Sequence, residues 1–226
     1  MALVVAVSTR VAAQDAPALL SRFAERKAET LLRESLPCLG CHRLNGDGGM
    51  IGPDLTTVTT RRNADYIAAI VTDPERTLPG TPMPRTLMNE ATRGLIIRYL
   101  TSRPAPRPAP GAGTATPAPA TVPARDAAAL YATYCAACHG ARGGGDGVNA
   151  KYLPVKPAVH ASREAMSQRS DDALFDTIFG GGAIMNRSPR MPAFGATLPR
   201  DDIRSLVRYI RTLCGCQGPA WAGDRR

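Results

Sequence analysis

The stretch CLGCHRLNGDGGMIGPDL, residues 38–55, contains two cysteines separated by two residues and a histidine directly after the second cysteine. The same spacing returns as CAACH at residues 135–139. A Met-Pro pair follows each motif, at Met83 and at Met191, and an Arg-Tyr pair follows each Met-Pro pair. Because these features recur in the same order, the sequence predicts two copies of one module.

A low-complexity segment separates the two copies. Residues 104–124 contain only proline, alanine, glycine, threonine, valine and one arginine. Such a composition cannot bury a core, and repeated proline favours an extended, semi-rigid spacer. We therefore predict one domain over residues 16–103, a linker over 104–124, a second domain over 125–216 and a C-terminal tail over 217–226.

Both modules have the pattern of helical domains. A polar, helix-favouring run at residues 16–35 leads into the first cysteine pair. Asn63, Asn89 and Ser170 stand where helix N-caps are expected, and apolar residues recur after them with a period near that of an α-helix. The last helix shows the same pattern over residues 203–213. Since the strand-like alternation of apolar and polar residues is missing, we predict an all-α fold with loops rich in glycine and proline.

Composition limits what the modules can be. The chain has 226 residues, of which only 5% are aromatic, and its formal net charge at pH 7 is +9. A small module with few aromatic side chains usually needs a disulfide, a metal or a cofactor to be stable. The positive charge favours an acidic protein partner or a membrane surface. No basic and aromatic motif indicates nucleic acid, so we expect no nucleic-acid partner.

The N-terminus resembles part of an export signal. Ala2–Val7 is apolar and VAAQDA offers small residues suited to a cleavage site, although no lysine or arginine precedes the apolar run. We interpret residues 1–15 as the remnant of a secretory signal and expect a periplasmic protein. No apolar run approaches the ~20 residues of a membrane-spanning helix, so any membrane association is expected to be peripheral.

Several kinds of site use two cysteines separated by two residues. A thioredoxin-like pair needs a βαβ setting that this sequence does not predict, and a zinc site needs a second ligand pair in the same module. A disulfide alone would not explain the histidine that follows both times. Covalent haem does, since two thiols on one helical turn can reach the two vinyl groups of the porphyrin while the next imidazole reaches the iron. The predicted attachment residues are Cys38, Cys41, Cys135 and Cys138, and the predicted iron ligands are His42 and His139.

At these motifs each half resembles the class I c-type cytochromes, and the whole chain resembles the two-domain dihaem cytochromes c. The resemblance rests on CLGCH, GPDL, PGTPMP and RYL within residues 20–103, and on YCAACHG, GDG, MPAFG and RYI within residues 125–213. It implies two tandem all-α domains in which the first and last helices cross and a covalently bound haem fills each core. A methionine from a downstream loop is the sixth iron ligand in that family.

The resemblance also implies how the proximal histidines are oriented. A ligating imidazole usually donates its other N–H to a second acceptor, and the family pattern gives that role to the backbone oxygen of Pro53, opposite His42. The second half has no Gly-Pro pair at the matching spacing. Pro154 and Pro157 are the alternatives there, and Pro157 is favoured.

Several side chains compete for the sixth position on each iron. The candidates are Met50, Met83 and Met88 in the first half, and Met166, Met185, Met191 and His160 in the second. Met83 and Met191 are favoured because each lies shortly before a last helix and is followed by a proline that stiffens the loop. Met50 has no methionine at the matching place near Val148, so we interpret it as loop packing at the haem edge. His160, in a loop with proline and alanine, is predicted to be exposed.

The last two cysteines, Cys214 and Cys216, follow the final predicted helix and have no histidine beside them. They therefore do not form a third haem site. Residues two apart rarely reach relaxed disulfide geometry, so the sequence leaves two free thiols and one local disulfide as alternatives.

Histidine and methionine together fill both axial positions of an iron, which favours a change of oxidation state over binding of a substrate. We therefore expect an electron carrier with two covalently bound c-type haems and no catalytic residues. It would pass electrons from a dehydrogenase or quinol-oxidising complex to a terminal oxidase or reductase, through acidic docking surfaces on those partners. A dihaem peroxidase-like enzyme and the cytochrome subunit of a dehydrogenase complex are the alternatives.

Overall fold

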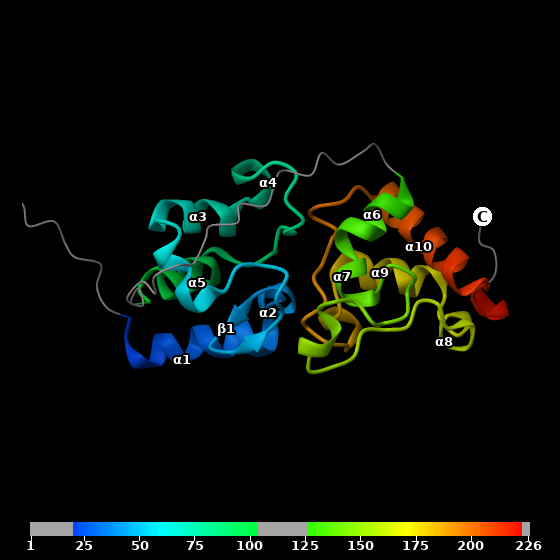
Figure 1. Ribbon diagram of the computed structural model, residues 1–226, viewed down its shortest axis with the longest axis horizontal. Helices are drawn as coiled ribbons and strands as arrows, with labels where there is room; N and C mark the ends of the chain where they lie inside the picture. Colours follow the sequence, from blue (N-terminus) through cyan, green and yellow to red (C-terminus); the bar gives the residue numbers. More distant parts are fainter. Residues whose placement is uncertain (1–19, 104–125, 223–226) are drawn as a thin grey trace, which may run out of the picture.

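The structure is a computed structural model that describes residues 20–103, here called the first domain, and residues 126–222, the second domain. Helices make up 55% of it and strands 2%, which confirms the all-α prediction. The two domains lie side by side (Figure 1). The predicted signal remnant at 1–15 and the predicted linker at 104–124 lie outside the described residues, as does the end of the predicted tail, residues 223–226.

The first domain consists of short helices and loops. Its elements are α1 at Arg22–Thr30, the π-helical turn η1 at Leu31–Ser35, α2 at Cys38–Cys41, the strands β1 at Arg43–Leu44 and β2 at Asp47–Gly48, the 3-10 turn η2 at Leu55–Thr60, α3 at Ala64–Thr72, α4 at Pro74–Thr77 and α5 at Glu90–Thr101. The two strands pair antiparallel, with Arg43 opposite Gly48. α1 packs against α5, so the first and last helices of the domain meet, as the resemblance implies.

The second domain repeats this plan. Its elements are α6 at Ala127–Tyr134, α7 at Ala136–His139, the 3-10 turn η3 at Ala150–Tyr152, α8 at Arg163–Ser167, α9 at Asp171–Gly180, the 3-10 turn η4 at Ala183–Met185, α10 at Arg200–Cys214 and the 3-10 turn η5 at Ala220–Ala222. α10 packs against both α6 and α9. The helix that enters the cysteine motif therefore again meets the last helix of its domain (Figure 1).

The predicted caps begin the helices that follow them. The side chains of Asn63, Asn89 and Ser170 accept hydrogen bonds from backbone N–H groups three residues later, at the starts of α3, α5 and α9. An accepting side chain satisfies one of the N–H groups that have no partner in the first turn of a helix. The three predicted starts are confirmed.

Apolar side chains from these helices fill one core in each domain. The first core includes Leu32, Leu39, Leu44, Ile67, Ile96, Tyr99 and Leu100. The second includes Leu130, Tyr131, Met166, Leu174, Ile178, Ile203, Leu206, Val207 and Ile210. The five buried residues of α10 are separated from one another by helical steps of three and four residues, which places them on one face and confirms the predicted amphipathic helix. Removing these side chains from water is the main stabilising term for each domain.

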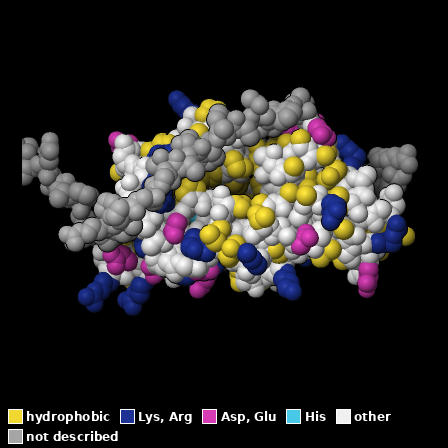
Figure 2. Space-filling view, viewed as in Figure 1, with side chains coloured by type: hydrophobic (Ala, Val, Ile, Leu, Met, Phe, Trp, Pro, Cys, Tyr) yellow, Lys and Arg dark blue, Asp and Glu magenta, His cyan; other side chains and the backbone are white. Residues whose placement is uncertain are grey.

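The positively charged side chains are spread over the surface. On the face in Figure 2, lysine and arginine side chains are scattered over both domains rather than gathered into one patch. Among the helices of the two described domains, none has the length and apolar character that crossing a membrane would require.

Candidate haem-binding sites

The first haem motif lies on α2 and on the residue after it. Pro37 begins this helix, and the backbone N–H of His42 donates to the backbone oxygen of Cys38 over 2.9 Å. The single turn therefore carries Cys38 and Cys41 at its two ends, and both are free thiols. Burial raises the pKa of Cys38 to about 11 and the pKa of Cys41 to about 12, so both thiols are protonated at neutral pH.

His42 is held by the loop that follows β2. Its Nδ1 lies 2.7 Å from the backbone oxygen of Pro53, and because a carbonyl oxygen only accepts, Nδ1 is the donor. Burial lowers the pKa of His42, which favours the neutral imidazole. Gly52 allows the loop to come this close, since a Cβ there would lie 2.6 Å from the His42 ring. The geometry leaves Nε2 as the nitrogen available to a metal.

The second haem motif follows α6 directly. The backbone N–H of Cys135 donates to the backbone oxygen of Tyr131 over 2.9 Å, and α7 carries Cys138 and His139. Both cysteines are free thiols. Burial raises the pKa of Cys135 to about 12 and also raises the pKa of Cys138. The second turn thus offers the same two thiols and one imidazole as the first.

The acceptor for His139 is not the predicted one. Its Nδ1 lies 2.9 Å from the backbone oxygen of Ala158, so the prediction of Pro157, or of Pro154 as its alternative, is wrong. The backbone oxygen of Pro157 instead faces Gly145, where an added Cβ would lie 3.0 Å from it. The loop therefore supplies the equivalent hydrogen bond one residue later than the sequence suggests.

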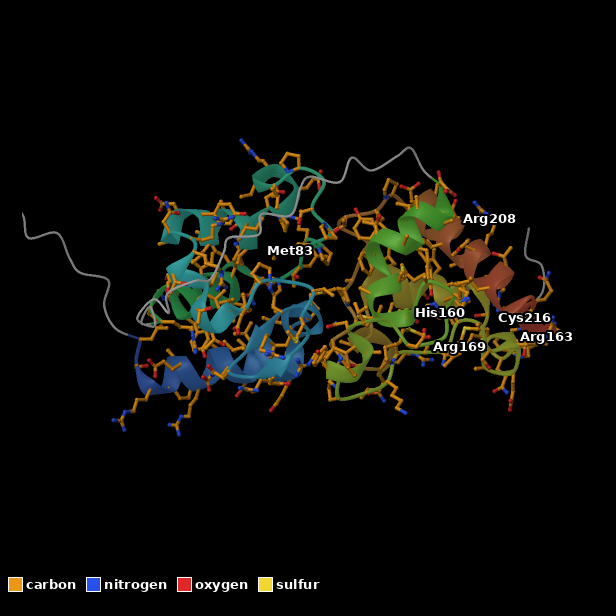
Figure 3. The ribbon with its side chains drawn as sticks, viewed as in Figure 1. Met83, His160, Arg163, Arg169, Arg208 and Cys216 are labelled. Atoms are coloured by element: carbon orange, nitrogen blue, oxygen red, sulfur yellow. A yellow bond between two sulfur atoms is a disulfide. The ribbon has the colours of Figure 1, made fainter. Side chains whose placement is uncertain are left out.

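A second histidine lies against His139. His160 is 8% exposed, and its ring stacks on the His139 ring with 4.0 Å between the centroids and 11° between the planes. The hydroxyl oxygen of Tyr131 lies 3.0 Å from Nδ1 of His160. Burial, together with His139 and Arg169, lowers the pKa of His160 to about 2, so this imidazole is neutral. The prediction of an exposed His160 is wrong, because the loop that brings Ala158 to His139 turns His160 inward (Figure 3).

The two favoured methionines lie in corresponding loops. Met83 lies between α4 and α5, Met191 lies between η4 and α10, and both are half-buried. Figure 3 places Met83 on the side of the first domain that faces the second. Met191 packs against the second core, and its backbone oxygen accepts a hydrogen bond from the N–H of Gly182 over 3.0 Å. Each methionine thus comes from the loop before the last helix of its domain.

The remaining methionines of the two described domains have different surroundings. Met50 is 50% exposed, and its sulfur accepts a hydrogen bond from Arg43 over 2.8 Å. Met166 is fully buried in the second core, where a flexible thioether fills space between helices. Met88 and Met185 are half-buried. Among these, Met50 has its sulfur on the surface rather than in a core.

One side chain connects the two haem motifs across the domain boundary. Asn149 is fully buried, and its Nδ2 donates to the backbone oxygen of Gly40 and, over 3.4 Å, to the sulfur of Cys138. Its Oδ1 accepts from the backbone N–H of Met50 over 2.8 Å. Sequence reasoning missed this role, because a loop sequence gives no signal of which residues in another domain it will contact.

Arg190 makes a second connection beside the first. Its guanidinium donates to the backbone oxygen of Leu39 over 3.0 Å and pairs with Asp47 over 3.1 Å, while Arg33 pairs with the same carboxylate oxygen over 2.7 Å. Arg190 itself is buried. The loop before α10 is therefore fixed on the first haem turn, and an added Cβ at Gly40 would collide with the backbone oxygen of Arg190.

The donor sets suit covalent haem. Each motif has two unpaired thiols on one helical turn and an imidazole whose Nδ1 is tied to a backbone oxygen, which leaves Nε2 free. Each domain adds a half-buried methionine in a loop that precedes its last helix. Thiols that are not oxidised to disulfides can form thioethers, and a neutral imidazole with a fixed tautomer can bind iron.

Comparison with known families agrees with this chemistry. A family model described as cytochrome c matches residues 27–103, and one described as cytochrome c oxidase, cbb3-type, subunit III matches residues 122–210. No curated protein and no solved structure matches the chain. The chain therefore consists of two tandem cytochrome c domains. It is a haem c electron-transfer protein with two covalently bound c-type haems.

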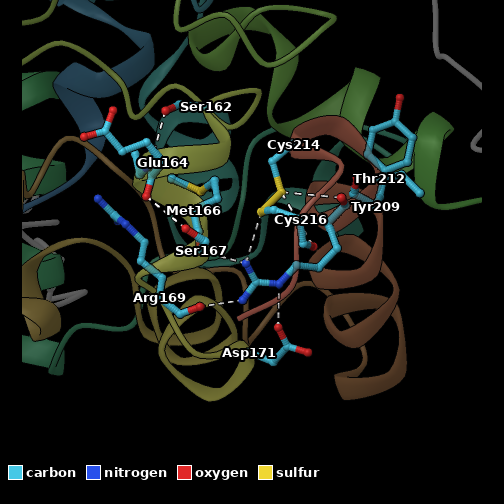
Figure 4. Close-up of a disulfide and its surroundings, with 12 residues drawn as sticks. Ser162, Glu164, Met166, Ser167, Arg169, Asp171, Tyr209, Thr212, Cys214 and Cys216 are labelled. Carbon is cyan, nitrogen blue, oxygen red and sulfur yellow. Dashed lines mark hydrogen bonds and ion pairs between the residues drawn. A yellow bond between two sulfur atoms is a disulfide. The ribbon is translucent and has the colours of Figure 1, made fainter. Parts of the chain in front are cut away.

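The remaining cysteine pair lies at the opposite end of α10 from the loop that carries Met191. Cys214 and Cys216 form a disulfide, which decides between the two alternatives that the sequence left open (Figure 4). Both cysteines are buried, and the guanidinium of Arg211 lies beside them, 3.8 Å from the sulfur of Cys216. They belong to the packing at the end of the second domain.

Proposed function

We propose that this protein is a periplasmic dihaem electron carrier in which His42 and Met83 bind one iron and His139 and Met191 bind the other. The observation that carries the proposal is the duplicated donor set, with two thiols, one oriented imidazole and one loop methionine in each domain. Haem iron that is bound on both faces alternates between Fe(III) and Fe(II) and has no open position for a substrate.

The chain's own residues supply what such a carrier needs. Cysteine thioethers would fix the porphyrin, while the backbone oxygens of Pro53 and Ala158 hold the proximal imidazoles in one orientation through Nδ1. Oriented and buried ligands change little between oxidation states, because a packed interior resists rearrangement. A small rearrangement favours rapid electron transfer over chemistry on a bound substrate.

The contact between the two haem motifs supports internal transfer. Asn149 connects the backbone of Gly40, between the first pair of cysteines, to the sulfur of Cys138 in the second motif. These groups are joined by hydrogen bonds, and both Asn149 and Gly40 are buried. An electron that enters through one domain would leave through the other along this route.

The net charge of the chain and its similarity to known families indicate what kind of redox partners it has. The net charge of +9 supports docking on acidic surfaces and association that weakens with added salt. The match of the second domain to a subunit of a cbb3-type cytochrome c oxidase supports an oxidase as the acceptor. The donor would be a dehydrogenase or a quinol-oxidising complex, reached by peripheral association.

The test is spectroscopy of protein produced with haem attached in a periplasm. We expect two haems per chain, each low-spin with a methionine-to-iron charge-transfer band. Met83→Ala and Met191→Ala should each make one haem high-spin and lower its reduction potential, and Met50→Ala, the control, should leave both haems unchanged. A wild-type protein with one high-spin haem that binds cyanide or peroxide would contradict the carrier and indicate a peroxidase. Co-purification with a large catalytic subunit would instead indicate a dehydrogenase complex.

A further inference from the structure

The second proximal histidine is backed by a polar pair that the proposed ligand set does not use. The imidazole of His160 lies face to face with that of His139, at 4.0 Å between centroids, and is almost completely buried. Its Nδ1 is fixed by the hydroxyl of Tyr131, 3.0 Å away. Tyr131 is itself buried, and its ring contacts that of Tyr209 at 5.2 Å. The stacking on His139 and the hydrogen bond to Tyr131 give this imidazole a defined orientation beside an iron ligand, which packing of the loop alone does not require.

The first domain provides an internal comparison. In each domain the residue two positions after the backbone acceptor of the proximal histidine is buried. That residue is Leu55 after Pro53 in the first domain, and His160 after Ala158 in the second. Leu55 belongs to an apolar core. Two residues after the backbone acceptor, the first domain therefore has an aliphatic side chain and the second domain has a polar one.

This difference in polarity affects the reduction potential of the iron, because oxidised haem iron carries one more positive charge than reduced iron. A polar, polarisable group next to an axial ligand stabilises the more highly charged state better than an aliphatic group does. The polarity and hydrogen bonding of the shell around a haem are among the properties with which a protein sets its reduction potential. Stacking with an angle of 11° between planes also limits rotation of the His139 ring.

We propose that His160, held by Tyr131, is a positioning residue that lowers the reduction potential of the second haem and so favours electron flow from the second domain to the first. The inference rests on the proposed dihaem function. At the corresponding place in the loop the first domain has the aliphatic Leu55, which offers no polar group of this kind to the first haem. The two haems would then serve as entry and exit rather than as equivalent sites.

The experiment is a potentiometric titration of the holoprotein at fixed pH and salt, followed by optical spectroscopy. His160→Leu gives the second domain the residue that the first already has. We expect one of the two midpoint potentials to rise while the other stays unchanged, with both haems still low-spin. The wave that moves should be the one that Met191→Ala also affects. A shift of both waves, a fall in potential or no shift would overturn the proposal.

Tyrosine variants separate the polar effect from simple packing. Tyr131→Phe keeps the ring and removes the hydroxyl that fixes His160, so it should raise the same midpoint by a smaller amount. Tyr209→Phe, the matched control, removes a hydroxyl from the neighbouring ring and should shift neither midpoint. If His160→Leu fails to fold, Tyr131→Phe still tests the proposal, since an unchanged midpoint potential of the second haem in that variant would overturn it. A wild-type protein that lacks two low-spin haems, each with its own midpoint potential, would contradict the proposed function itself. That result would be seen in the wild-type protein, before any variant is measured.

Discussion

At the scale of single residues, the sites depend on how closely the backbone can approach a ring. Gly52 lies against His42, and a Cβ there would lie 2.6 Å from the ring atoms Nδ1 and Cε1. Real Cβ atoms do not come so near, so either the ring or the loop would have to move. The hydrogen bond to Pro53 holds both of them. The position of the imidazole therefore depends on the absence of a side chain next to it.

We expect Gly52→Ala to displace the His42 ring and weaken its bond to the first iron. Absorption and electron paramagnetic resonance spectra should show a high-spin fraction at one haem only. Gly94→Ala is the matched control, since position 94 lies in α5 and its only near neighbour is the end of the flexible Arg98, at 3.7 Å. That control should raise the free energy of unfolding by about 1 kcal/mol, the usual gain for alanine in a helix. Two unchanged low-spin haems in Gly52→Ala would refute the expectation.

At the scale of elements, one arginine joins α10 to the segment that links α8 and α9. Arg211 binds Asp171 over 2.8 Å and donates to the backbone oxygens of Met166 and Arg169 (Figure 4). Its side chain is only 10% exposed. Because backbone oxygens after the last turn of a helix have acceptor capacity that the helix does not use, one buried guanidinium can bond to the oxygens of Met166 and Arg169 and to the Asp171 carboxylate at once.

Arg211→Met should lower the free energy of unfolding by about 2–3 kcal/mol, because it leaves buried backbone oxygens without a charged donor. Chemical denaturation of the holoprotein measures this change. Arg208→Met is the control on the same helix, since Arg208 is exposed and bonds only to Ser205 among the contacts of its side chain in the described residues. Its effect should stay within about 0.5 kcal/mol. Equal effects of the two variants would show that burial of Arg211 is unimportant.

The disulfide at the end of α10 should contribute little. Cys214 and Cys216 are two residues apart, so the cross-link restricts a very short loop in the unfolded chain. The chain-entropy relation gives at most about 1.6 kcal/mol for so short a loop. A variant with both cysteines replaced by serine should therefore retain both haems and unfold with a free energy lowered by no more than this amount. Loss of folding would show that the pair does more than cross-link.

The helices could be predicted from the sequence, whereas several loop contacts could not. Asn63, Asn89 and Ser170 act through neighbours three residues away, and the buried face of α10 recurs at helical spacing, so local sequence was sufficient. The haem motifs were equally clear, because their chemistry requires a fixed short spacing. Ala158 and His160 depend instead on how one loop closes over α7, and no local rule distinguishes that closure from one using Pro157.

At the scale of the whole molecule, the two domains are joined by a few polar contacts, and those made by Asn149 and Arg190 with backbone oxygens are buried. Asn149 and Arg190 from the second domain reach the backbone of the first haem turn, and Arg85 donates through its backbone N–H to Thr197 over 3.0 Å. A buried polar group is stable only when it has a hydrogen-bond partner, and here each domain supplies partners for buried polar groups of the other. The sequence could not predict this docking, because the partner atoms at Leu39 and Gly40 are backbone oxygens, which every residue possesses.

Gly40→Ala should separate the domains, because its Cβ would collide with the backbone oxygen of Arg190. We expect a larger radius of gyration in small-angle X-ray scattering and slower electron exchange between the haems after photoreduction, with both haems retained. Asn149→Ala should change both measurements in the same direction. Gly94→Ala again serves as the control and should alter neither. Unchanged exchange in both interface variants would mean that electrons do not pass through this contact.

The burial of Leu39 and Gly40 also bears on the order of events during biogenesis. In the docked molecule the second domain covers the turn to which the first porphyrin must be joined. A ligase that makes the thioethers at Cys38 and Cys41 needs access to that turn. Haem loading of the first domain should therefore come before docking, so that the closed form is the last stage of maturation.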